Sequence, residues 1–322
     1  MIYDYDKTIK NIKKEKREQY TEYILKAPYE EKFYKENEKL IFRVFENKKP
    51  LKGDIVFIHG IGPNNIKYLQ WYAEYFSKQG YRTTMTILPY HYKRKDQNII
   101  DGDPFYSADP DVCVELFHNA VKDVRKTIDY ISDFQDFKNE NLHVMGVSFG
   151  GIIATMLLAL DDRINKGILT ITGGNWRWIN FHSPYTERVR KEYKEKGNAY
   201  GCNGEEFCVK NYRNNPKEFI LKNFSSVEDI FEKSKIPCYQ YDPISFAPFV
   251  DNKVLFIKGK YDKIIPERST DELYDLLPNA KMKKFPAGHK SSILFKRIIG
   301  RWAINFIEKE WWIWIKVLIF YL

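Results

Sequence analysis

Residues 142–160 read LHVMGVSFGGIIATMLLAL, and this stretch decides the fold. Its first six residues form a short apolar run of the length typical of a buried strand, and an apolar helical pattern begins near Gly151. Ser148 lies between the two, flanked by Gly146 and Gly150. Glycines on both sides let a strand and a helix close up around a tight turn that holds the serine hydroxyl out of the helix. The stretch therefore predicts a nucleophilic serine at the end of a strand.

Short apolar strands alternate with helical patterns on both sides of this turn. Strands are predicted at 40–45, 55–62 and 81–88 before it, and at 166–173 and 253–259 after it. Helical patterns separate them, and a final helix is predicted over 291–308. Such alternation is typical of a mostly parallel, doubly wound sheet with helices on both faces. One α/β domain is predicted over residues 40–310.

Three further segments differ in composition from this domain. Lysine and glutamate dominate residues 1–39, which we interpret as an N-terminal helical extension. The strand and helix pattern fails over 175–242, and an insertion of that size is predicted to be a helical lid. Residues 311–322, WWIWIKVLIFYL, form an apolar aromatic tail that is shorter than the roughly 20 residues a membrane-spanning helix needs.

Composition excludes several classes of protein. The 52 Lys and Arg exceed the 43 Asp and Glu to give a net charge of +9, but both signs are interleaved and no nucleic-acid-binding motif appears. We therefore expect a solvated lysine-rich surface and no nucleic-acid partner. Four scattered cysteines fit neither a disulfide framework nor a zinc site. A cytoplasmic protein without metal or cofactor is predicted.

The tail raises two alternatives. Tryptophan and tyrosine favour the bilayer interface, so residues 311–322 are either an anchor for peripheral membrane contact or a surface buried by self-association or by the N-terminal extension. Neither alternative changes the predicted chemistry.

A serine nucleophile needs a base, and the base needs an acid to orient it. Asp262 follows the strand predicted at 253–259, and His289 follows Asp262 by 27 residues, on a loop before the last helix. Asp242 and Asp251 are the competing acids. The order along the chain is Ser148, Asp262, His289.

At this point the chain resembles the α/β-hydrolase superfamily over roughly residues 40–308. The resemblance lies in HGIG at 59–62, GVSFG at 146–150, GKYDKIIP at 259–266, and Gly288 with His289. It implies a catalytic triad of Ser148, Asp262 and His289, and a serine hydrolase that cleaves carboxylic esters through an acyl-serine intermediate, without a cofactor.

Acyl transfer also needs backbone N–H donors for the oxyanion. The expected donors are Phe149, directly after the nucleophile, and Ile61 in the HGIG loop, with Gly60 as the alternative. His59 is expected to brace this loop. Three other residues at strand ends are candidates for the substrate pocket: His91, Arg94 and Trp176. Ordering of a loop, or packing between lid and core, is the competing interpretation of these three.

Several functions remain open at this level. The substrate is expected to be a small-molecule or lipid ester, but a triad does not fix the leaving group, so a peptidase or thioesterase is the alternative. The tail and the basic charge favour a lipase at a membrane surface. A catalytically silent interaction protein would be expected to lack a triad member, and all three are present.

Overall fold

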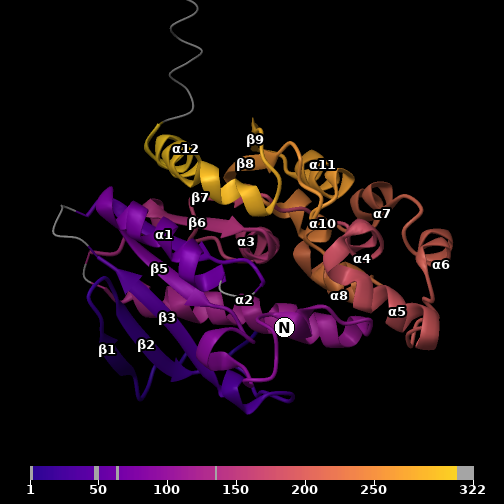
Figure 1. The fold of residues 1–322 in the computed structure, drawn as a ribbon, viewed down its shortest axis with the longest axis horizontal. Helices are drawn as coiled ribbons and strands as arrows, with labels where there is room; N and C mark the ends of the chain where they lie inside the picture. The colour runs from indigo at the N-terminus through magenta and orange to yellow at the C-terminus, as the bar shows by residue number, and fades with distance from the viewer. Residues whose placement is uncertain (1–2, 47–50, 63–64, 135, 310–322) are drawn as a thin grey trace, which may run out of the picture.

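The computed structural model describes residues 3–46, 51–62, 65–134 and 136–309. Within these residues a single sheet of nine strands runs in the order β1-β2-β3-β5-β4-β6-β7-β8-β9 (Figure 1). The strands are β1 Lys13–Lys16, β2 Thr21–Lys26, β3 Lys39–Phe45, β4 Gly53–Ile58, β5 Tyr81–Ile87, β6 Leu142–Val147, β7 Lys166–Thr170, β8 Lys253–Gly259 and β9 Ala280–Phe285.

Twelve α-helices occur in the same described part of the chain. They are α1 Asn65–Lys78, α2 Pro110–Ser132, α3 Phe149–Leu160, α4 Trp176–His182, α5 Glu187–Lys196, α6 Glu205–Asn211, α7 Pro216–Asn223, α8 Val227–Glu232, α9 Cys238–Tyr241, α10 Pro243–Phe246, α11 Glu267–Leu276 and α12 Lys296–Glu308. Two 3₁₀ turns matter for the site, η5 Pro184–Thr186 and η7 Lys290–Phe295.

The sheet is parallel from β5 through β9 and antiparallel from β1 to the β3–β5 pair. The predicted doubly wound α/β sheet is therefore confirmed. The strand predicted at 40–45 pairs with β2 and β5 rather than with β4. Because the carboxyl ends of parallel strands meet at one edge, Ser148 after β6, Asp262 after β8 and His289 after β9 all lie along the same edge.

Helices cover both faces of the sheet (Figure 1). One apolar cluster joins α1 and α12 to the sheet, and includes Phe76 and Ile299. A larger cluster on the other face joins α2, α3 and the inserted helices to the sheet, and includes Phe117 and Ile153. Burial from both sides explains why β4, β6, β7 and β8 carry apolar runs instead of alternating. Strand β5 is equally buried, but three of its seven residues are threonines.

The prediction of a helical N-terminal extension is wrong. Residues 13–16 and 21–26 are strands that add an antiparallel edge to the sheet. Two cross-strand pairs hold β2 on β3: Tyr23 stacks on Phe42 at 5.1 Å, and the Arg43 Nε donates to the Glu22 carboxylate at 3.0 Å. The alternation of residues with a period of two, which marks a strand, is hidden here because the segment is rich in lysine and glutamate.

The insertion is helical, as predicted for 175–242, and its helices α4 to α10 continue to Phe246. These helices form the end of the molecule opposite β1 and β2 (Figure 1). Residues 311–322 lie outside the described residues, so both alternatives for the tail stay predictions. Among the residues that are described, no helix combines the length and the apolar character needed to cross a membrane.

Candidate active site

Ser148 lies on a strained turn between β6 and α3, with φ 56° and ψ −121°. Neighbouring glycines make the turn possible. A Cβ on Gly146 would lie 2.2 Å from the Gly150 carbonyl oxygen, and a Cβ on Gly150 would lie 2.1 Å from the Ile58 carbonyl oxygen. Backbone held in such a sparsely populated conformation marks a functional position.

The three residues nominated from the sequence meet at this turn. His289 Nε2 lies 2.8 Å from the Ser148 Oγ, and His289 Nδ1 lies 2.7 Å from Asp262 Oδ2. The other oxygen of Asp262 accepts the backbone N–H groups of Ile264 and Ile265, at 2.8 and 3.0 Å. An Nδ1–H that donates to the carboxylate leaves Nε2 as the acceptor for the serine hydroxyl. These contacts have the geometry that a serine nucleophile, its base and an orienting acid require.

The competing acids lie elsewhere. Asp242 is fully buried, accepts the N–H groups of Asn175 and Trp176 at 2.8 Å each, and forms an ion pair with Arg213. Asp251 is exposed and precedes β8, at the opposite end of the strand from Asp262. Neither forms a hydrogen bond with His289.

The HGIG loop is fixed by His59. The Leu88 N–H donates to His59 Nε2 at 3.0 Å, so Nδ1 carries the proton and donates to the Gly60 carbonyl at 2.8 Å. Burial lowers the pKa of His59 well below its ordinary value, which keeps the ring neutral. In a trans peptide the N–H points opposite to the C=O, so the Ile61 N–H points away from the His59 ring.

This loop and the helix after the nucleophile bracket Ser148. A Cβ on Gly60 would lie 3.1 Å from the Ser148 Cβ, so the loop backbone packs directly on the nucleophile. Phe149 is the first residue of α3, and the first N–H groups of a helix have no carbonyl partner within it. Both backbone segments therefore lie beside Ser148.

A cavity of about 530 Å³ opens over Ser148 and His289, with mostly apolar walls. Its volume is within the range of small-molecule sites. Apart from Ile61, sequence reasoning missed the residues that form the walls, although Tyr68 and Tyr72 lie one helical turn apart shortly after HGIG. The lining side chains beyond the triad include Ile61, Tyr68, Leu69, Tyr72, Val147, Thr170, Ile171, Tyr185, Lys290, Ser292 and Ile293.

Comparison with known families decides the identity. The model of the family described as serine hydrolase (FSH1) matches residues 62–291. The chain belongs to this serine hydrolase family. The match covers the nucleophile turn, the acid and the histidine, and the protein is thus a hydrolase of the α/β-hydrolase type.

Solved structures share the fold of this serine hydrolase at low sequence identity. The acetyl xylan esterase from Paenibacillus sp. R4 aligns with a TM-score of 0.59 and 13% identity, over 92% of this chain and 87% of that one. Acetyl xylan esterase 1 from Thermoanaerobacterium sp. JW/SL YS485 aligns with a TM-score of 0.58 and 13% identity, over 95% and 90%. The enol-lactonase from Burkholderia xenovorans LB400 gives 0.53 and 15%, over 84% and 97%. No curated protein matches the sequence.

His91 and Arg94 do not line the cavity of the serine hydrolase, so their assignment to the substrate pocket is wrong. Both are fully buried. His91 Nδ1 lies 2.8 Å from the Pro89 carbonyl oxygen, and burial lowers the pKa of this histidine to about 4. Arg94 pairs with Asp123 at 2.6 Å and donates to the Tyr29 hydroxyl at 2.9 Å. These residues order the loop after β5, which was the alternative role that the sequence suggested for them.

Trp176 is also outside the cavity. Its ring packs between Phe117 and Tyr241 in the core, at centroid distances of 5.3 and 6.0 Å. It joins the insertion to α2, which is the lid-core packing that the sequence left as the alternative. Within the described residues there is no group of His, Cys, Asp or Glu side chains that could hold a metal ion, and all four cysteines are free thiols.

Proposed function

We propose that this serine hydrolase cleaves carboxylic esters through an acyl-serine intermediate. The observation that carries the proposal is the continuous hydrogen-bonded relay from Ser148 Oγ through His289 to Asp262. In this mechanism Ser148 Oγ attacks the ester carbonyl while His289 Nε2 takes its proton. Asp262 holds the imidazole in the required tautomer and stabilises the cation that forms.

The oxyanion of the tetrahedral intermediate would be stabilised by the N–H groups of Phe149 and Ile61. Collapse of the intermediate breaks the ester C–O bond, and His289 delivers its proton to the leaving alcohol. Water then attacks the acyl-Ser148 ester with His289 as base, and the acid product leaves as the serine regains its proton. The chain's own residues suffice for each step, and we propose no cofactor.

The walls of the cavity support an ester with an apolar acyl group. Tyr68, Tyr72 and Ile171 offer mainly apolar surface next to the nucleophile. The names of the two acetyl xylan esterases and the enol-lactonase describe ester cleavage by proteins of the same fold. Cleavage of peptides or thioesters would use the same relay, so assays with those substrates belong to the test.

We propose that the inserted helices act as a lid over the cavity. Their contribution to its lining is Tyr185, which lies in η5 directly after α4. The lid therefore closes one side of the entrance and leaves the rest to α1 and η7. We propose a cytoplasmic location on the ground of the four free thiols, because a reducing compartment keeps cysteines in that state.

The test is hydrolysis of nitrophenyl esters of increasing acyl length by the wild type and by Ser148→Ala and His289→Ala. We expect turnover in the wild type and a loss of at least about 10³-fold in each variant, since removal of a triad member leaves only the weaker stabilisation by oxyanion donors and binding. If the folded wild type cleaves amides or thioesters but no ester, the proposed substrate class is wrong. Turnover that survives in Ser148→Ala would overturn the mechanism.

A further inference from the structure

Exposed apolar side chains gather around the entrance of the cavity. Tyr68 and Tyr185 line the cavity and are nevertheless 47% and 39% exposed. Leu294 follows the lining residue Ile293 and is 81% exposed, and Ile298 lies one turn further along and is 43% exposed. A group of large exposed apolar residues is typical of an interaction surface, whereas single ones need no explanation.

A basic groove continues this surface between α1 and α12. Its volume is about 260 Å³, and it is lined by Trp71, Glu74, Tyr75, Lys78, Arg297 and Arg301. Three of these six residues are cations and one is a carboxylate. Residues 289–307 contain four Lys or Arg residues and no Asp or Glu. The groove, and the chain segment that links it to His289, therefore both carry an excess of positive charge.

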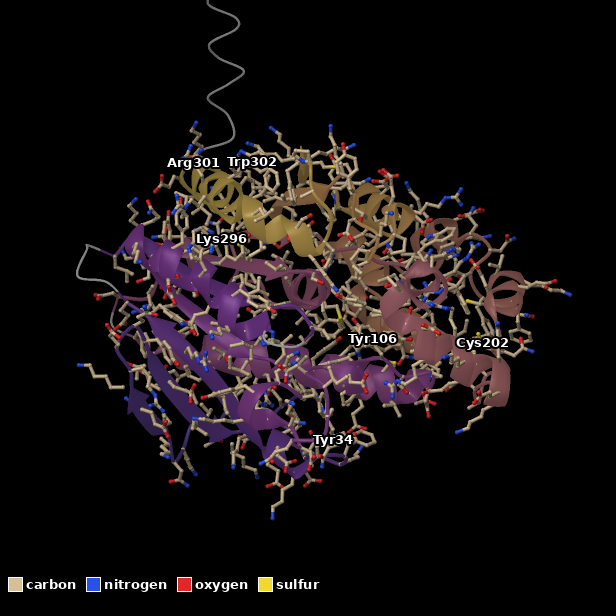
Figure 2. The ribbon with its side chains drawn as sticks, in the orientation of Figure 1. Tyr34, Tyr106, Cys202, Lys296, Arg301 and Trp302 are labelled. Atoms are coloured by element: carbon tan, nitrogen blue, oxygen red, sulfur yellow. The ribbon has the colours of Figure 1, made fainter. Side chains whose placement is uncertain are left out.

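Aromatic rings of α1 and α12 are paired with cations of α12 and of the neighbouring strand β9. Lys296 Nζ lies 4.9 Å from the Trp71 ring centroid, and Lys283 Nζ lies 4.9 Å from that of Trp302. Figure 2 shows Lys296, Arg301 and Trp302 along α12, on the side of the molecule away from the inserted helix region that holds Cys202. Aromatic rings beside cationic heads are the composition found at the interface of a bilayer.

Helical spacing makes the entrance and the groove one continuous face. On α1, Tyr68 of the cavity is one turn from Trp71 of the groove. Ile293 of the cavity likewise precedes Arg297 of the groove by four residues. We call this surface the entrance face, and define it by Tyr68, Trp71, Leu294, Arg297, Ile298 and Arg301.

We propose that the entrance face docks on an anionic lipid surface, from which an ester substrate reaches the cavity. The excess of cations complements the negative charge of anionic headgroups, and Leu294 and Ile298 supply side chains that can enter the interfacial layer. A bound protein would cover the entrance, whereas a fluid lipid layer can deliver a substrate through it. The inference rests on the proposed ester hydrolysis only for the role of the cavity.

The experiment is co-sedimentation of the full chain with vesicles of phosphatidylcholine alone and of phosphatidylcholine with 30 mol% phosphatidylserine. The paired charge reversal Arg297→Glu/Arg301→Glu and the variant Leu294→Ser change the face without touching the cavity lining. The control is Lys194→Glu/Lys196→Glu, which makes the same change of charge on exposed positions of α5, well away from α12 (Figure 1). Ser148→Ala is included to separate binding from turnover.

We expect binding to the anionic vesicles only, weakened at high salt. The reversal on α12 should reduce the partition coefficient at least tenfold, because each basic residue near an anionic surface contributes substantially to binding. Leu294→Ser should reduce it severalfold, and the α5 reversal and Ser148→Ala should leave it near the wild-type value. Turnover of a water-soluble short-chain ester should be unchanged in Leu294→Ser.

Several results would overturn the proposal. One is the absence of binding to anionic vesicles, and another is binding that falls equally in the α5 and α12 reversals. Vesicle binding that is unchanged by the charge reversal on α12 would show that another part of the chain binds the lipid. A dimer that the α12 reversal dissociates, without vesicle binding, would assign the face to a second copy. Loss of ester turnover in Ser148→Ala with vesicle binding retained would leave the two proposals independent.

Discussion

Asp262 is the residue whose role the geometry defines most narrowly. One carboxylate oxygen faces His289 Nδ1 and the other accepts two backbone N–H groups, so the side chain is fixed on both sides. Asp262→Asn keeps the size but presents the wrong hydrogen-bonding partner to the imidazole. We expect kcat to fall by roughly 10⁴-fold, the effect of this change in a known triad.

The control for this prediction is Asp251→Asn, which changes an exposed carboxylate before the same strand. Steady-state kinetics on a nitrophenyl ester provide the measurement, with circular dichroism as a check of folding. Equal activity of Asp262→Asn and Asp251→Asn would remove Asp262 from the mechanism.

Gly150 sets the steric limit of the nucleophile turn. Because an added Cβ would meet the Ile58 carbonyl oxygen at 2.1 Å, Gly150→Ala should force the turn away from β4. We expect it to lower the free energy of unfolding by about 3 kcal/mol or more, at the upper end of overpacking effects. Urea denaturation is the measurement. Gly204→Ala serves as the control, since a Cβ there meets nothing within 4 Å, and a similar loss in both variants would refute the argument.

For individual residues, the sequence predicted those that lie close together at the strand ends, but it missed most of the residues that line the cavity. Ser148, Asp262 and His289 could be nominated because each follows a strand or loop pattern that places it at one edge. His91, Arg94 and Trp176 also follow strands, but their side chains are buried and contact other residues inside the protein. Polarity at a strand end does not tell a substrate contact from a buried loop anchor.

A buried ion pair links two segments within the insertion. Asp242 pairs with Arg213 at 2.9 Å and caps the start of α4 through Trp176 N–H at 2.8 Å. Burial raises the pKa of Asp242, opposed by the Arg213 charge. Removing one partner leaves the other charge buried, so we expect Asp242→Ala to lower the free energy of unfolding by about 3 to 5 kcal/mol.

A double-mutant cycle with Arg213→Met tests this pair. The double variant Asp242→Ala/Arg213→Met should recover part of the loss, because no unpaired charge remains in the core. Urea denaturation of the four proteins is the measurement. Additive losses, with no recovery in the double variant, would show that the pair does not hold these two segments of the insertion together.

Edge strands explain why the N-terminal elements escaped prediction. The two outer strands are β1, with the sequence KKEK, and β9, with the sequence AKMKKF. Lysine on an edge strand discourages pairing with another chain, but it also hides the period of two that marks a strand. The central strands carry long apolar runs instead, and their positions could be predicted within a few residues.

The stability of the whole molecule should decrease in acid. Burial lowers the pKa of His91, His118 and His143 to about 4 each, so between pH 6.5 and 4 the unfolded chain binds protons that the folded chain does not. Each histidine therefore removes about 2 kcal/mol of stability between pH 7 and pH 5. Asp123 acts in the opposite direction, since burial raises its pKa to about 6.

For these three histidines and Asp123 together we expect a loss of about 4 kcal/mol in the free energy of unfolding between pH 7 and pH 5. Burial also lowers the pKa of His59, which adds to this loss, and raises the pKa values of Asp54 and Asp242, which oppose it. Urea denaturation at the two pH values measures it. His118→Gln, which retains a donor towards the Gln240 carbonyl, should shrink the difference by about one histidine's share. A free energy that stays level or rises on acidification would contradict the assignment of these histidines as neutral in the folded state.

The parallel sheet brings three residues from distant parts of the chain to one edge, and the central claim is that they act together on an ester. The most direct measurement is reaction with a fluorophosphonate, followed by mass spectrometry of the peptides. We expect one adduct, on Ser148, that is absent in Ser148→Ala and much slower to form in His289→Ala. A folded wild type that stays unlabelled, or an adduct on another residue, would contradict it.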